Sequence, residues 1–258
     1  QIDYIAENLA DLGPWHIIVD AGWYVSEGRE GAEWRNVDAE KFPSGLADLV
    51  AYARAKGIRV VLYFSAPYLD DRRAEGNWLG LRGIVDQQPD WLIPLSQHGD
   101  ERGFVYDFDN PGLRQYLTTV MQDFFVKYDV DGIKIDGLGN AEGEIMTATE
   151  QDTFGEVNKV EMATLPIYQF IHKTVSGLKE HAYIESGWSI PQFAQSCAHT
   201  FRFGDEQSSF DFPYPFGGLR QHVDYAILQK TMLGQNPNMG AIRGHPDQDF
   251  LGLWRLGA

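Results

Sequence analysis

The sequence predicts an α/β fold, a TIM (β/α)8 barrel, because segments with the helical period alternate with short apolar runs, several of which end in an acidic residue. Short strands that are apolar almost throughout are typical of a parallel sheet buried on both faces. The chain has 258 residues, 43% of them hydrophobic, and α/β barrels of about 200–250 residues commonly form one domain. We therefore expect residues 1–258 to form a single catalytic barrel domain.

The hydrophobic period predicts six strands and four helices. The strands are expected at 15–20, 58–64, 131–136, 181–186, 199–204 and, more weakly, 239–243. The helices are expected at 2–12, 46–56, 111–128 and 159–179. A closed barrel of this type needs eight strands. Because Gln1 already begins a helical pattern, we expect a piece of a larger protein, with the first strand before Gln1 and the last after Ala258.

Local signals refine this pattern at three places. Gly57 follows the second helix as a C-cap, and Asn110 with Pro111 supplies the N-cap and first residue of the third. Residues 67–102 are too long for an ordinary strand-to-helix loop. This excursion either shapes a substrate cleft or forms an inserted hairpin without a ligand role.

Composition narrows the possible partners. The net charge is −16 and no basic run occurs, which argues against nucleic acid. No apolar stretch approaches the roughly 18 residues of a membrane span, so no membrane partner is predicted. The single Cys197 is expected to be a buried small hydrophobe. Neither metal-ligand spacing nor a nucleotide-binding motif is present, so we predict no metal and no organic cofactor.

Two aspartates are the leading catalytic candidates. Asp136 ends the strand DGIKID, and Asp205 directly follows the strand HTFRFG. Barrel enzymes keep their chemistry at this end of the strands, and hydrolysis of a glycosidic bond uses a pair of carboxylates. The alternative is that each aspartate only caps the helix that follows.

Two basic residues accompany these acids. Lys134 is expected on the same side of its strand as Asp136, facing the barrel axis, where it would keep Asp136 ionised and bind sugar hydroxyls. Arg202 precedes Asp205 by three positions and either binds substrate or pairs with an acid near the barrel mouth. A Schiff-base lyase or aldolase using Lys134 is a weaker alternative, because Asp136 would hold that amine protonated.

Two further strand tips carry candidate substrate-binding residues. Asp20 is expected to accept hydrogen bonds from sugar hydroxyls, with Trp23 as an apolar platform for a pyranose ring. The alternative is a capping Asp20 and a Trp23 that only packs. Glu185 and Trp188 occupy the equivalent tip of another strand, where a functional and a structural role are equally open.

Together these segments resemble the retaining α-galactosidase clan, nearer its bacterial melibiase and raffinose-synthase-like branch. The match covers most of the chain and consists of an ordered series: VDAGWY, KFPSGLADLVAYARAKGIRVVLYFSAP, QQPDW and YDFDNPGLRQYL. The family's Lys-Trp-Asp motif falls on Lys134 to Asp136, which implies Asp136 as nucleophile. Its Ser-Asp-Asn motif falls on Gly204 to Glu206, which implies Asp205 as general acid/base.

The resemblance implies a retaining glycoside hydrolase that cleaves terminal α-linked sugars from oligosaccharides or glycosides by double displacement. Two departures limit what it implies about the sugar. Family members that cleave α-galactosides have two adjacent acids where this chain has Asp20 and Ala21. The family's Cys-x-x-Gly-Gly-Arg segment is replaced by Glu185-Ser186-Gly187-Trp188. A transglycosylase of the raffinose-synthase type and a non-catalytic carbohydrate-binding barrel remain as alternatives.

Overall fold

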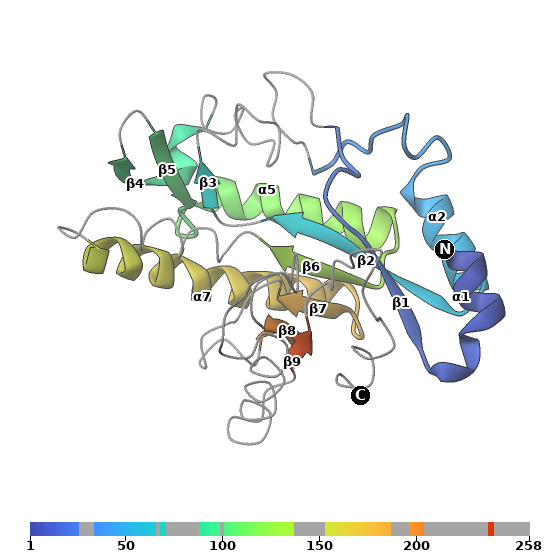
Figure 1. Ribbon diagram of the computed structural model, residues 1–258. Helices are drawn as coiled ribbons and strands as arrows, with labels where there is room; N and C mark the ends of the chain where they lie inside the picture. The colour runs from blue at the N-terminus through green and yellow to red at the C-terminus, as the bar shows by residue number, and fades with distance from the viewer. Residues whose placement is uncertain are drawn as a thin grey trace.

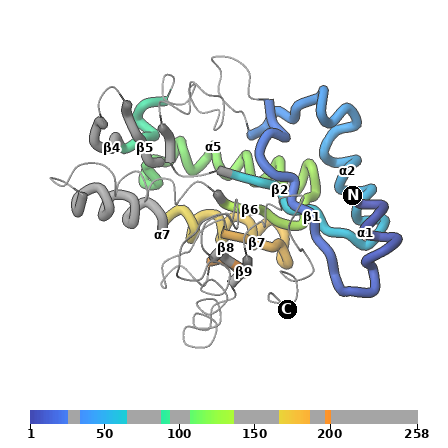
Figure 2. The backbone as a smooth tube through the Cα atoms, in the orientation of Figure 1, coloured from blue at the N-terminus to red at the C-terminus, as the bar shows by residue number. Residues whose placement is uncertain are grey.

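The structure is a computed structural model. It describes the backbone of residues 1–25, 34–65, 68–70, 88–98, 101–136, 153–186, 197–203 and 237–239. Within these ranges, it describes the side chains of residues 1–25, 34–64, 88–93, 107–135, 166–186 and 197–200. Figure 2 traces the backbone, with these side-chain ranges in colour.

A parallel sheet forms the centre of the described structure (Figure 1). Its strands, in spatial order, are β1 (Trp15–Val19), β2 (Ile58–Ser65), β6 (Gly132–Asp136), β7 (Tyr183–Ser186), β8 (Thr200–Phe203) and β9 (Pro237–Met239). Each strand pairs in parallel with the next. The predicted α/β class and the six parallel strands are confirmed, although β9 begins two residues before the predicted 239–243, of which residues 240–243 lie outside the described residues.

In the described part of the chain, four α-helices accompany these strands; the first precedes the sheet and the other three connect successive strands, as parallel pairing requires. They are α1 (Ile2–Asn8), α2 (Leu46–Ala55), α5 (Pro111–Gln122) and α7 (Thr153–Leu178). The first ends earlier than predicted because Leu9, at φ −127°, leaves the helical region before a 3-10 turn at Ala10–Leu12. Helix α5 continues as a π-helical turn at Asp123–Lys127. Among the described residues, no helix is long and apolar enough to cross a membrane.

The two predicted helix caps are confirmed, although α7 begins at Thr153, six residues before its predicted start. Asn110 Oδ1 accepts hydrogen bonds from the amides of Gly112 and Leu113, which satisfies two donors in the first turn of α5. Gly57, which follows α2, has φ +76°, a left-handed conformation that glycine adopts without steric cost.

The long excursion contains a separate antiparallel sheet. Strand β5 (Glu101–Tyr106) lies between β3 (Tyr68–Asp70) and β4 (Leu92–His98), and a 3-10 turn at Pro89–Trp91 leads into β4. The β4–β5 pair fits the inserted-hairpin interpretation. Residues 71–87 lie outside the described residues, so a role in a substrate cleft stays a prediction.

The two faces of the central sheet differ in polarity. One face carries apolar side chains that are 0% exposed, including Val60, Leu62 and Phe64 on β2 and Ile133 and Ile135 on β6. They belong to one core cluster with residues of α5 and α7, namely Leu113, Leu117, Val120, Ile167, Ile171 and Val175. Each such side chain contributes about 1.5–3 kcal/mol through burial. Cys197 is also buried, as predicted.

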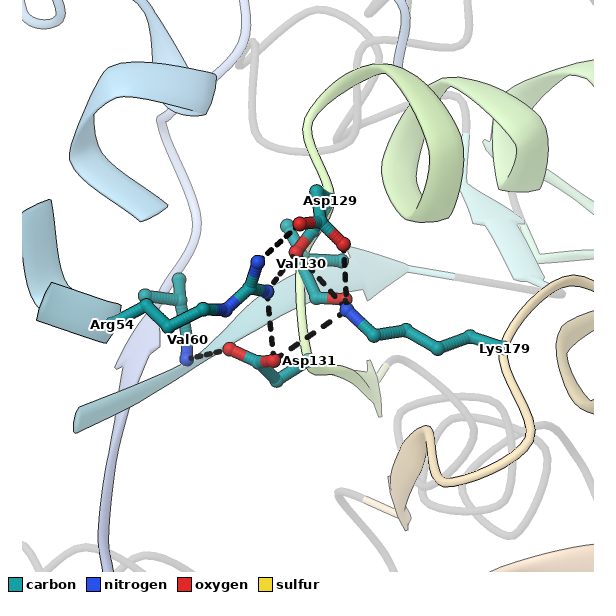
Figure 3. A network of polar contacts seen from close by, with 6 residues as sticks. All are labelled: Arg54, Val60, Asp129, Val130, Asp131 and Lys179. Carbon is teal, nitrogen blue, oxygen red and sulfur yellow. Dashed lines mark hydrogen bonds and ion pairs between the residues drawn. The ribbon is translucent and has the colours of Figure 1, made fainter. Parts of the chain in front are cut away.

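A group of charged side chains joins several elements at the amino end of β6 (Figure 3). We call Arg54, Asp129, Asp131 and Lys179 the amino-end network. Asp131 accepts hydrogen bonds from the Val60 amide (2.9 Å) and from Arg54 (2.9 Å). Asp129 pairs with Arg54 and, at 2.9 Å, with Lys179. The network therefore connects the end of α2, strand β2, the entry to β6 and the segment after α7.

Candidate active site

Polar side chains form a row across the other face of the sheet, from Asp20 after the carboxyl end of β1 to Thr200 at the start of β8. Tyr63 on β2 is in register with Lys134 on β6, Lys134 with Glu185 on β7, and Glu185 with Thr200 on β8. Asp20 directly follows β1 and continues this row beside Tyr63. Residues in register across parallel strands project to the same face. The sheet thus brings Asp20, Lys134 and Glu185 together from positions far apart in the sequence.

Lys134 is the buried basic residue of this row. The residue is only 6% exposed, and its Nζ donates a hydrogen bond to Asp20 Oδ2 at 3.0 Å. The same Nζ lies 5.7 Å from the centre of the Tyr63 ring, within cation–π range. Asp20 is the exposed partner, because 59% of its side-chain surface is accessible. The other Asp20 carboxylate oxygen, Oδ1, accepts a hydrogen bond from the Ala21 amide at 2.9 Å.

Glu185 is the second buried charged residue of the row. It is 3% exposed, and its Oε2 accepts a hydrogen bond from the Tyr183 hydroxyl at 3.3 Å. Its neighbour Ser186 points to the opposite face and contacts the Tyr168 hydroxyl of α7 at 2.5 Å. The tip of β7 is therefore fixed on both faces, once by Tyr183 and once by the helix packed behind it.

Trp23 does not occupy the predicted position. Its side chain is 1% exposed, its Nε1 donates to the Tyr63 carbonyl at 2.9 Å, and its ring packs edge-on against Tyr24 and Phe124. A ring enclosed in this way has no surface to offer a sugar. The prediction of a pyranose platform is corrected accordingly, and Trp23 is a core residue, the packing alternative named above.

The remaining candidates are placed by the backbone or lie outside the described residues. Asp136 is the last residue of β6, in register with Ser65, and alternation puts it on the same face as Lys134. Arg202 lies in β8, on the same face as Thr200, and is in register with Asn238 on β9. Asp205 and Trp188 lie outside the described residues.

Besides Tyr63, two residues of this face were missed by the sequence reasoning. Tyr183 and Thr200 contact each other at 2.5 Å, and Tyr183 also contacts Glu185. The available signal was the alternation along β7, which puts Tyr183 on the same face as Glu185. In the described part of the chain, no group of three or more His, Cys, Asp or Glu residues could hold a metal ion.

A parallel α/β sheet with carboxylates and an ammonium group at the carboxyl ends of its strands is the arrangement found in α/β-barrel enzymes. The family comparison makes this assignment specific. The model of the Melibiase family matches residues 1–189, and the chain belongs to that family. No match is found among functionally curated proteins.

Solved structures share the fold at low sequence identity. An α-galactosidase from Thermus thermophilus in complex with stachyose matches with a TM-score of 0.60 and 15% identity, over 99% of this chain and 53% of that one. A β-L-arabinopyranosidase from Geobacillus stearothermophilus matches with a TM-score of 0.57 and 17% identity, over 92% and 55%. A maltogenic α-amylase from Thermotoga neapolitana matches with a TM-score of 0.56 and 16% identity, over 90% and 51%.

The chain therefore spans about half the length of these proteins. At such identities the likeness concerns the fold alone. Family membership and these likenesses imply the TIM-barrel fold that the sequence predicts.

Proposed function

We propose that this chain is the catalytic barrel domain of a retaining glycoside hydrolase that removes terminal α-linked sugars from glycosides or oligosaccharides. Membership of the Melibiase family supports glycoside hydrolysis. The observation that carries the proposal is the buried Lys134 ammonium group, which shares its strand face with Asp136 and lies 3.0 Å from Asp20. We further propose that residues 1–258 are a single domain and that their parallel sheet belongs to a closed eight-stranded barrel.

In the proposed reaction, Asp136 attacks the anomeric carbon while Asp205 gives its proton to the departing glycosidic oxygen. The bond to the leaving group breaks as the bond to the Asp136 oxygen forms. Asp205 then takes a proton from water, and the resulting hydroxide displaces Asp136 from the opposite side. Two displacements give net retention at the anomeric carbon.

The surrounding residues are assigned to substrate binding. Lys134 favours the ionised form of a nearby carboxylate and donates hydrogen bonds to sugar hydroxyls, while Asp20 and Glu185 accept them. Arg202 and Trp188 are assigned to the same site from the sequence. Ala21 offers no second carboxylate beside Asp20, and a missing polar partner changes sugar preference strongly where a site is built around it. The identity of the preferred sugar is therefore determined by the experiment that follows.

The test uses the full-length protein and aryl α- and β-glycosides of galactose, glucose, N-acetylgalactosamine, arabinopyranose and fucose. One α-glycoside is expected to be hydrolysed, and Asp136→Asn should lower kcat/KM by about 10³-fold or more. Asp11→Asn, which changes an exposed carboxylate, is the matched control and should remain fully active. NMR of the first-formed product should show the α-anomer.

Azide distinguishes the roles of the two aspartates. With Asp136→Gly, azide can replace the missing nucleophile in a single displacement and should give a β-glycosyl azide. With Asp205→Ala, azide attacks the glycosyl-enzyme and should give the α-azide. A fully active Asp136→Asn variant, or a β-anomer as the first hydrolysis product, would refute the proposed mechanism.

Other outcomes would identify the alternatives. Sugar transfer to an acceptor in place of hydrolysis would identify a transglycosylase, because the same two carboxylates serve both reactions. Sugar binding without turnover in the full-length protein would identify a non-catalytic carbohydrate-binding barrel.

A further inference from the structure

Tyr183 lies two residues before Glu185 on β7, on the same face of the sheet. Its hydroxyl connects the side chains of Glu185 and Thr200. Its hydroxyl lies 2.5 Å from Thr200 Oγ1 and 3.3 Å from Glu185 Oε2. The three side chains come from neighbouring strands, because Glu185 is in register with Thr200. Together they form a continuous chain of two hydroxyls ending on a carboxylate.

The chemistry of the three groups gives this chain a direction. The Tyr183 hydroxyl donates its hydrogen bond to Glu185 Oε2. Tyr183 has one proton to donate, so Thr200 must donate to the Tyr183 oxygen. Burial, the largest effect, raises the pKa of Tyr183 to about 12, and the neighbouring Glu185 acts in the same direction. Tyr183 therefore remains a proton donor at neutral pH.

The Tyr183 ring is held in place by aromatic neighbours. The His16 ring on β1 lies 5.1 Å from its centre, and the His199 ring stacks on it at 5.9 Å with an interplanar angle of 28°. His199 is itself fixed, since its Nδ1 accepts from the Ile184 amide at 3.1 Å and its own amide donates to the Ile184 carbonyl at 2.8 Å. Burial, followed by the nearby His172, lowers the pKa of His199, which favours the neutral ring that this acceptor role requires.

The close approach of two strands supports the same geometry. Gly132 on β6 is in register with Tyr183, and a Cβ built there would lie 2.5 Å from the Tyr183 carbonyl oxygen. Only glycine permits this spacing, because real Cβ atoms do not approach a carbonyl oxygen so closely. The close approach thus fixes the position of β7 against β6, which places Tyr183 beside Gly132 and Glu185 beside Lys134.

We propose that Tyr183 is a positioning residue that, with Thr200, orients the Glu185 carboxylate for hydrogen bonding to a hydroxyl of the bound sugar. The inference deepens the proposed function and rests on it. Tyr183 itself does not contact the reacting atoms. Its removal should weaken the binding of the sugar through Glu185 and leave the chemistry of the two catalytic aspartates largely intact.

The first test is Tyr183→Phe, which removes the hydroxyl and keeps the ring between His16 and His199. In the full-length protein we expect KM for the hydrolysed glycoside to rise about three- to tenfold, with kcat changed by less than about twofold. Tyr168→Phe is the matched control, because it removes another hydroxyl that contacts β7 but lies on the opposite face. The control should leave KM unchanged.

A double-mutant cycle tests whether Tyr183 acts through Glu185. In the Glu185→Ala background, Tyr183→Phe should have no further effect on KM, since the group that it orients is gone. If Glu185→Ala fails to fold, as its melting transition would reveal, Thr200→Val replaces it and should raise KM in the same direction by a smaller factor.

The outcomes separate the inference from the proposed function. A wild-type protein that hydrolyses a glycoside, with the same KM in Tyr183→Phe, would overturn the positioning role alone. Equal effects of Tyr183→Phe with and without Glu185 would also overturn it. A wild-type protein that hydrolyses no glycoside would overturn the proposed function, and the inference with it.

Discussion

The amino end and the carboxyl end of the central sheet use charged side chains in different ways. At the amino end, Asp129 and Asp131 are each paired with both Arg54 and Lys179, so four charges from distant segments satisfy one another. At the carboxyl end, the buried Lys134 pairs with an Asp20 that is 59% exposed. In the first arrangement every charge has two partners of opposite sign, although Arg54 and Asp129 are partly exposed, whereas in the second a buried ammonium group meets an exposed carboxylate.

This difference separates stability from function within one sheet. In barrel enzymes, the amino-terminal face of the strands contributes mainly to stability, and the carboxyl-terminal face carries the reaction. Replacing residues at one end should therefore change the free energy of unfolding, and replacing them at the other should change catalysis. The three predictions below test that separation.

The largest effect is expected at Lys134. Lys134→Met keeps an unbranched chain of similar volume and removes the charge, so we expect kcat/KM to fall about 10²-fold. The free energy of unfolding should change by less than about 1 kcal/mol, because an apolar side chain is cheaper to bury than an ammonium group. Glycoside hydrolysis and urea denaturation measure the two quantities. The control is Lys173→Met, at an exposed position of α7, which should alter neither quantity. If Lys134→Met lowered stability without lowering activity, the proposed separation of stability and function would be wrong.

A smaller effect, on stability and not on catalysis, is expected at Asp131. Asp131→Asn removes the charge that Arg54 and Lys179 share and weakens the bond to the Val60 amide. We expect the free energy of unfolding to fall by about 2 kcal/mol, with kcat/KM unchanged at a temperature where the variant is folded. The control is Asp11→Asn, which should stay within about 0.5 kcal/mol of the wild type. A large change in kcat/KM would show that the two ends are coupled.

The smallest effect is a pH dependence that arises at the amino end. The hydrogen bond from Arg54, followed by the one from Lys179, lowers the pKa of Asp129 below its ordinary value of 3.8. A lowered pKa in the folded state means that this stability is present above pH 3.8 and is lost as the pH falls through the folded pKa. Asp129→Asn should therefore flatten the acid limb of the unfolding free energy, and the effect should shrink in high salt because Asp129 is half exposed. An unchanged acid limb would exclude Asp129 as its source.

Hydrophobic period and strand alternation were enough to predict much of this fold. They gave the parallel strands, the α5 N-cap at Asn110 and the side of β6 on which Lys134 and Asp136 lie. These features are local, so nearby residues determine them. The final strand begins two residues earlier than predicted, at Pro237, because proline and asparagine do not extend its short apolar pattern.

Features that depend on distant contacts were not predictable in the same way. Trp23 follows the Asp20 strand tip closely in sequence, yet the chain turns it into the core, where it packs against Phe124 from the π-helical turn after α5. Lys134 pairs with Asp20, 114 positions away, a contact that the sequence did not suggest, while the side chain of the expected neighbour Asp136 lies outside the described side chains. Alternation gives the face of a side chain, but it does not give its partner.

The contact between Gly132 and Tyr183 has a consequence for how this protein can change over evolutionary time. Since the β6 position has no room for a Cβ, it accepts no second amino acid unless β7 moves as well. Substitution of Gly132 is therefore not available as a route to a new sugar preference. Substitution is possible at positions such as Ala21, which is exposed and follows the end of β1. We therefore expect changes in sugar preference to arise in the segments that follow the strands and not within the strands themselves.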